Sequence, residues 1–244
     1  MNRTITPTMT LAQIASLWPE LIPFLESKRL DYCCGGHRTL ADAADSIGLT
    51  SDTIAQELSS IPAPIPSEPE RDWRSATMTE LADHIELTHH AFVRKTLERL
   101  ETLICKCVQA HSDDEPRLTE LQTVIASFAE DMQDHMIREE RVLFPWLRRL
   151  ERPTEIQSGP PWSVRRPIDC MVHDHDNAGR ALETMRALTD NFTPPASACS
   201  TWKETYRLLA EINADTHLHI HKENNILFPA GIESERMRVG AGRS

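Results

Sequence analysis

The sequence uses one eleven-residue pattern twice, and the pattern contains side chains that bind metal ions. Residues 135–145 read HMIREERVLFP and residues 219–229 read HIHKENNILFP. Each copy has a histidine, a glutamate four residues later and a Leu-Phe-Pro ending. Residues four apart lie on the same face of an α-helix, so each histidine and its glutamate can face one ion. Imidazole and carboxylate together suit iron, zinc or manganese.

Two further histidines extend this repeat. His90 lies 45 residues before His135, and His175 lies 44 residues before His219. Two such helix pairs form a four-helix bundle with ligands directed inward from every helix. Four imidazoles and two carboxylates exceed the four ligands of one structural zinc ion, whereas they suit two metals with both carboxylates bridging. We therefore predict a two-metal site made of His90, His135, Glu139, His175, His219 and Glu223.

A structural explanation competes with this one, because a histidine on the core face of a helix is usually a hydrogen-bonded core residue. The glutamates decide between the two, since burying an unpaired carboxylate costs roughly several kcal/mol. The remaining histidines near the site are expected to do no more than supply hydrogen bonds to the ligands: His84, His89, His173, His217 and His221. We expect His111 and Glu140 to be solvated.

Composition narrows the class of protein. The 244 residues are 40% hydrophobic but only 5% aromatic, with eight glycines, which favours an all-α fold. The net charge of −11 argues against binding to nucleic acid or to an anionic membrane, because both attract clustered positive charge. There is no apolar run of about 20 residues, and the first twenty residues lack the apolar core of a secretory signal. Six cysteines without disulfide-scaffold spacing favour a cytoplasmic location.

The chain is expected to form two domains. Residues 1–60 predict a small helical domain around the sequence DYCCGG, and residues 61–72 a linker in which alternating prolines exclude a helix. Residues 73–244 predict the four-helix bundle, with helical stretches at about 77–110, 118–149, 167–190 and from 200 onward. The apolar spacing places Val142 and Val172 on core-facing stripes.

The adjacent pair Cys33 and Cys34 has two interpretations. It is either a buried small-residue turn or an accessible thiol pair that binds soft metal, nitric oxide or a partner. Adjacent cysteines are poorly placed for an unstrained disulfide with each other. Core packing is the expected role of the other four cysteines: Cys105, Cys107, Cys170 and Cys199.

These motifs together resemble a known family. The histidine and glutamate pattern with Leu-Phe-Pro is similar to a hemerythrin-like domain, and DYCCGG with the proline-rich linker and Asp72-Trp73-Arg74-Ser75 resembles the iron–sulfur cluster repair di-iron proteins. The resemblance implies two non-heme iron ions, oxo- and carboxylate-bridged, on the six residues named above. Oxygen-carrying hemerythrins have histidine and aspartate where this chain has Gly179 and Asn224, which disfavours reversible oxygen carriage.

The resemblance implies repair of iron–sulfur clusters damaged by nitric oxide or peroxide. Two routes stay open, supply of iron and removal of nitric oxide, with Cys33 and Cys34 as a thiol transfer or partner site. The expected partners are damaged iron–sulfur proteins and small molecules such as nitric oxide or oxygen, and the chain could form a homodimer. Two alternative functions are an oxygen or nitric oxide sensor and an enzyme that reduces nitric oxide. The cysteine pair favours repair over sensing, because a sensor has no evident need for it.

Overall fold

The computed structural model describes residues 3–62, 71–152 and 163–241, and within them it contains helices and no strand. The prediction of an all-α fold is confirmed. Residues 63–70 of the predicted linker, and the loop predicted around Pro153 to Pro161, lie outside the described residues. No helix in the described part of the chain is long and apolar enough to cross a bilayer. The described residues form two compact units, one within 1–76 together with 220–229, and the other within 77–219 together with the described residues from 230 onward.

The first unit is built from short helices around its own core. The Thr10 hydroxyl and the Gln13 side chain cap the first helix reciprocally, as a capping box predicts. Buried leucines and isoleucines, with Tyr32, form the core on which these helices pack. The helices are α1 (Leu11–Leu17), α2 (Ile22–Ser27), α3 (Leu40–Ser46) and α4 (Ser51–Ser60), with 3₁₀ turns at Pro19–Leu21 and Trp73–Ser75.

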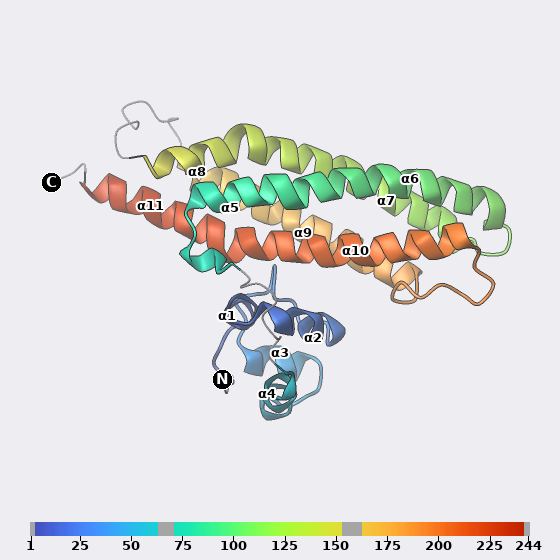
Figure 1. Ribbon diagram of the computed structural model, residues 1–244, viewed down its shortest axis with the longest axis horizontal. Helices are drawn as coiled ribbons and strands as arrows, with labels where there is room; N and C mark the ends of the chain where they lie inside the picture. Colours follow the sequence, from blue (N-terminus) through green and yellow to red (C-terminus); the bar gives the residue numbers. More distant parts are fainter. Residues whose placement is uncertain (1–2, 63–70, 153–162, 242–244) are drawn as a thin grey trace. The chain divides into compact units, whose positions relative to one another are not determined.

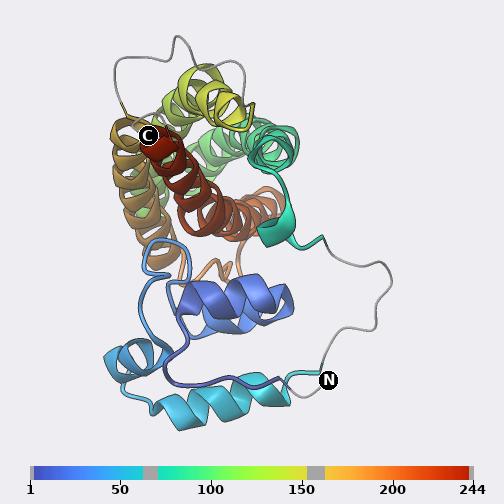
Figure 2. The same ribbon diagram turned by 90° about the vertical axis from the view of Figure 1, so that its left-hand side faces the viewer.

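The second unit is a bundle of long helices. Helix α7 packs against α6 and α9, and α5 packs against α8. Figure 1 shows α5 and α6 continuing one another beside α7 and α8, and Figure 2 views these helices nearly end-on. The α-helices of the second unit are α5 (Met78–His84), α6 (Ala91–His111), α7 (Arg117–Arg138), α8 (Phe144–Leu150), α9 (Arg165–Leu188) and, apart from residues 220–229, α10 (Ser200–Lys222) and α11 (Phe228–Ala241).

A carboxylate from a distant helix fixes the start of α5. The side chain of Glu151, just after α8, accepts the backbone N–H of Met78 at 2.5 Å and that of Thr79 at 3.0 Å. The first N–H groups of a helix have no partner within it, so a carboxylate there satisfies them and favours the positive end of the helix dipole. This contact ties the end of α8 to the beginning of α5.

The prediction for Val172 was wrong. Val172 is 37% exposed, whereas Met171 and Ala178 are buried together with Ile168 and His175. Both Met171 and Val172 fit the helical period, because a step of three and a step of four from Ile168 each return to nearly the same face. The packed stripe takes the three-residue step, which apolar spacing alone does not distinguish.

Gly36 provides a test of packing in the first unit. A Cβ at this position would meet the Tyr32 carbonyl oxygen at 2.5 Å and the Ala12 Cβ at 2.9 Å, whereas one at Gly179 would meet nothing within 4 Å. Gly36→Ala should therefore lower the free energy of unfolding by about 1–3 kcal/mol. Gly179→Ala, inside α9, should raise it by about 0.5–1 kcal/mol. Denaturant titration of both variants checks this, and a neutral Gly36→Ala would contradict the packing.

Candidate metal centre

The structure brings the six predicted residues together in the bundle interior. Their ligand atoms fall into two groups, within each of which all atoms lie within 4.8 Å of one another. One group is His90, Glu139, His219 and Glu223, and the other is His135, Glu139, His175 and Glu223. All six residues are at most 1% exposed. The two glutamates belong to both groups.

Glu139 lies close to two of the predicted ligand histidines. Its Oε2 atom is 3.4 Å from the Nε2 atom of His90 and 3.2 Å from that of His135. The Nε2 atoms of His135 and His175 are 3.2 Å apart. Several donor atoms of the kinds that bind iron, zinc or manganese therefore converge away from solvent. This donor set fits the two-metal site that the sequence predicts.

Wide π-helical turns occur where the ligands are attached. One turn, Ile85–His90, ends at a proposed ligand, while Glu139–Leu143 and Glu223–Leu227 each begin at one. In the last two, the N–H of the following phenylalanine bonds the glutamate carbonyl five residues back. Single π turns within α-helices are frequent at functional sites.

The Leu-Phe-Pro endings explain two of these turns. Pro145 and Pro229 lack an N–H, and a proline ring inside an α-helix collides with the carbonyl four residues back. A wider turn before the proline relieves that collision. It also places one more residue in the turn, which changes the residue that faces the core. As a result Leu143 and Leu227 are buried. Val142, predicted to face the core, is 44% exposed, so that prediction was wrong.

Carboxylates outside the group contact its histidines. The Nδ1 atom of His90 lies 2.7 Å from Oε1 of Glu140, which also accepts a hydrogen bond from Arg94 at 2.8 Å. Partial burial raises the pKa of the Glu140 carboxyl, but the hydrogen bonds from His90 and Arg94 outweigh it and leave the pKa below its usual value. The prediction that Glu140 is solvated was wrong. Its contact with His90 joins residues 50 apart, and no local pattern announces it.

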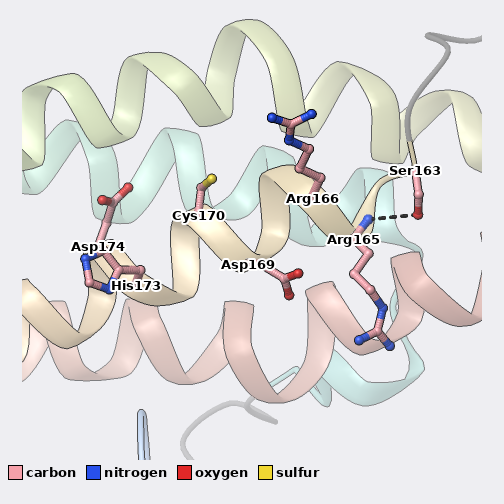
Figure 3. A pocket seen from close by; sticks show the side chains of 7 residues that line it. All are labelled: Ser163, Arg165, Arg166, Asp169, Cys170, His173 and Asp174. Carbon is pink, nitrogen blue, oxygen red and sulfur yellow. Dashed lines mark hydrogen bonds between the residues drawn. The ribbon is translucent and has the colours of Figure 1, made fainter.

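A second contact of this kind involves His135 and Asp174. The Nδ1 atom of His135 lies 3.5 Å from Oδ2 of Asp174, which pairs with Arg138 at 3.0 Å. Asp174 also lines a surface groove of about 600 Å³ on the outer side of α9. Figure 3 shows Asp174 and His173 at one end of this groove and Ser163 at the other.

The flanking histidines take different positions. His89 is buried, bonds Asp215 at 2.9 Å and stacks on His219 with ring centroids 5.6 Å apart. His221 is buried and His173 is exposed. His84 and His217 are half-buried. His89 therefore contacts a proposed ligand by ring stacking, while its hydrogen bond goes to Asp215.

The cysteine pair forms a tight turn organised by Asp31. The Asp31 carboxylate accepts the backbone N–H groups of Cys34 at 2.9 Å and Gly35 at 2.8 Å, and the Cys33 thiol donates to it at 3.2 Å. Asp31, Cys33 and Cys34 also form a group of side chains that could hold a metal ion. Cys33 is buried, whereas Cys34 is partly exposed, and both are free thiols. The Cys34 thiol and then burial raise the pKa of the Cys33 thiol well above its usual value.

The same unit includes the helical segment that carries Glu223. Asn225 donates to the carbonyl oxygen of Cys33 at 3.1 Å. The Nδ1 atom of His221 lies 3.2 Å from the carbonyl oxygen of Tyr32, and its Nε2 atom lies 3.1 Å from the Ser16 hydroxyl. The turn is thus attached to residues on both sides of Glu223 in the chain.

The core prediction for the remaining four cysteines was wrong for three of them. Only Cys107 is a core residue, since Cys170 is exposed and Cys105 and Cys199 are partly exposed. The Cys199 thiol lies 3.3 Å from Nε2 of His111, so His111 is not simply solvated as predicted. The backbone N–H of Trp202 and then the His111 ring lower the pKa of the Cys199 thiol. Cys199 precedes α10, and a helix N-terminus stabilises a thiolate.

Comparison with known proteins agrees with this arrangement. Residues 81–231 match the hemerythrin HHE cation-binding domain, and residues 8–61 match the ScdA_N domain, a domain of unknown function. The chain is 34% identical over 226 residues to the iron–sulfur cluster repair protein YtfE of Musicola paradisiaca, an alignment that covers 93% of this chain and 97% of the relative. It is 36% identical over 226 residues to the protein of the same name from Escherichia coli O81, with 92% and 97% covered.

Thiol reactivity should follow these environments. At neutral pH, Cys199 should be alkylated by iodoacetamide roughly an order of magnitude faster than Cys33, because the thiolate is the nucleophile. His111→Gln should slow Cys199 and leave Cys33 unchanged, since His111 contributes to the lowered pKa of Cys199 alone. Peptide mass spectrometry over a time course measures both rates. Faster labelling of Cys33 than of Cys199 would show that these environments are assigned wrongly.

Proposed function

This chain belongs to the family of iron–sulfur cluster repair proteins, and we propose that it restores iron–sulfur clusters damaged by nitric oxide or peroxide. Its clients in this proposal are damaged iron–sulfur proteins of the cytoplasm. The single observation that best supports the proposal is the buried group of four imidazoles and two carboxylates. Such a group suits redox-active iron better than it suits a structural role, because a structural zinc ion needs only four ligands.

The proposed cofactor is a pair of non-heme iron ions. His90 and His219 would hold one ion, and His135 and His175 the other, with Glu139 and Glu223 shared between them and an oxo bridge completing the pair. The membership of both glutamates in both ligand groups supports this division. Bound iron would supply redox chemistry and positions for a small molecule such as nitric oxide or oxygen. The protein's own contribution is to keep six ligand side chains away from bulk water and aimed at one place.

The proposed domain organisation assigns different tasks to the two parts of the chain. Residues 73–244 would form the iron-binding bundle, and residues 1–60 would present the thiols of Cys33 and Cys34 across a linker at 61–72. Cys34 is partly exposed and Cys33 is buried, so Cys34 is the thiol that a partner would meet first. The Asp31 carboxylate beside both thiols adds an oxygen ligand for a cation.

An isotope experiment distinguishes iron supply from removal of nitric oxide. The full chain, loaded with ⁵⁷Fe, is mixed with a client enzyme whose cluster has been damaged by nitric oxide. Iron supply predicts ⁵⁷Fe in the repaired cluster, as seen by Mössbauer spectroscopy. Removal of nitric oxide predicts a repaired cluster that contains only the client's own iron. A client whose cluster is not repaired by the loaded chain contradicts the proposed function.

Glu139 and Glu223 should control the iron content. Replacing either with alanine removes a proposed bridging ligand from both ions, so each variant should retain roughly half of the wild-type iron or less. His84→Ala, a half-buried neighbour outside both groups, should retain all of it. Metal analysis of the purified proteins measures this. Wild-type iron content in both glutamate variants would show that these glutamates do not bridge the two ions.

The thiol pair should matter for repair but not for iron binding. The double variant Cys33→Ala/Cys34→Ala should keep the iron absorption spectrum and lose most of its repair activity. Cys170→Ala, which changes an exposed cysteine elsewhere, is the matched control and should behave as the wild type. Full repair by the double variant would make the turn purely structural. Loss of iron with the thiols would show that they are ligands of the centre.

A further inference from the structure

Two of the proposed ligand histidines are each held between the metal group and an outer carboxylate. The Nε2 atom of His90 points toward Glu139, while its Nδ1 atom lies 2.7 Å from Glu140. His135 repeats this arrangement, with Nε2 toward Glu139 and Nδ1 toward Asp174. A neutral imidazole carries one proton, and a carboxylate beside Nδ1 holds it there. The lone pair of Nε2 is then available to a metal ion.

An arginine supports each outer carboxylate. Arg94, one turn after His90, bonds Glu140 at 2.8 Å, and Arg138, three residues after His135, pairs with Asp174 at 3.0 Å. Each arginine lies on the same continuous helical segment as the histidine whose carboxylate partner it binds. The arginine fixes the carboxylate in place and balances its charge. The carboxylate can then accept a hydrogen bond from the histidine N–H without adding a net negative charge near the site.

The two arrangements differ in strength. The Glu140 contact at 2.7 Å is a short hydrogen bond, whereas the Asp174 oxygen at 3.5 Å is beyond the usual range for one. Asp174 lines the groove of Figure 3 and Glu140 does not. The two side chains are about equally exposed, 23% for Asp174 and 27% for Glu140, so the distances alone rank the two contacts. The hold on His90 is therefore tighter than the hold on His135.

We propose that Glu140 and Asp174 are positioning residues of the metal centre, and that Glu140 contributes more to metal affinity than Asp174 does. The proposal rests on the proposed function, since it assumes that His90 and His135 bind iron. In metal sites, loss of a carboxylate that orients a ligand histidine lowers affinity by about 10–100-fold. We assign the larger effect to Glu140 and a smaller one to Asp174.

The first measurement needs no metal. Histidine-selective ¹⁵N NMR of the metal-free full chain reports which ring nitrogen carries the proton. His90 should carry it on Nδ1 in the wild type and in Glu140→Gln, whose amide oxygen still accepts the hydrogen bond. In Glu140→Ala the proton should move wholly or partly to Nε2. An unchanged His90 signal in Glu140→Ala overturns the proposal. A general loss of folded structure would not produce a shift confined to His90.

The second measurement is ferrous affinity, determined with Fe²⁺ alone in competition with a chelator. Glu140→Ala should bind about 10–100-fold more weakly than the wild type, Glu140→Gln less so, and Asp174→Ala should lose less than Glu140→Ala. Glu130→Gln, an exposed carboxylate on α7, is the matched control and should bind as the wild type. An equal or larger loss in Asp174→Ala overturns the ranking.

Folding is checked by circular dichroism, and if Glu140→Ala does not fold, the shape-preserving variants decide. Glu140→Gln should then weaken binding more than Asp174→Asn, and the reverse order contradicts the proposal. Wild-type protein that binds no iron would overturn the proposed function instead. The NMR result would in that case still decide whether Glu140 fixes the tautomer of His90.

Discussion

The burial of two carboxylates in the middle of a helical bundle is the constraint on which the rest of the structure depends. Glu139 and Glu223 are fully buried and share their surroundings with four buried imidazoles. Removing a carboxylate from water costs roughly several kcal/mol unless positive charge or donors replace the lost hydration. Neutral imidazoles supply little positive charge, and a pair of cations supplies it directly. The length of the helices, the inward direction of the ligands and the repeated sequence pattern all serve this compensation.

The backbone adapts to the same constraint. Val142 and Leu143 lie three and four residues after Glu139, so either could share its face in an unbroken α-helix. π turns begin at Glu139 and Glu223, and the buried residues beyond them are Leu143 and Leu227. Pro145 and Pro229 favour these turns, because a proline has no N–H for the α-helical hydrogen bond and its ring collides with the carbonyl four residues back. The Leu-Phe-Pro motif thus has a physical role beside the ligands, although none of its residues is a proposed ligand.

Sequence analysis predicted much of the fold and of the site, and its errors have physical causes. The all-α fold and the convergence of His90 and His135 on Glu139 follow from periodicity and spacing, which can be read from the sequence. Contacts such as Glu140 with His90 join different helices, so only the packed bundle reveals them. Val142 and Val172 were misplaced because a one-residue choice of register leaves the apolar pattern nearly unchanged. The core prediction for Cys199 was wrong because its position beside His111 depends on where two different helices begin and end.

The most direct test of the account is anomalous diffraction from a crystal of the iron-loaded full chain, measured on both sides of the iron absorption edge. The account predicts two anomalous peaks inside the bundle, one beside His90 and His219 and the other beside His135 and His175, with Glu139 and Glu223 reaching both. A single peak, or two peaks of which either lies outside this group of side chains, would contradict it.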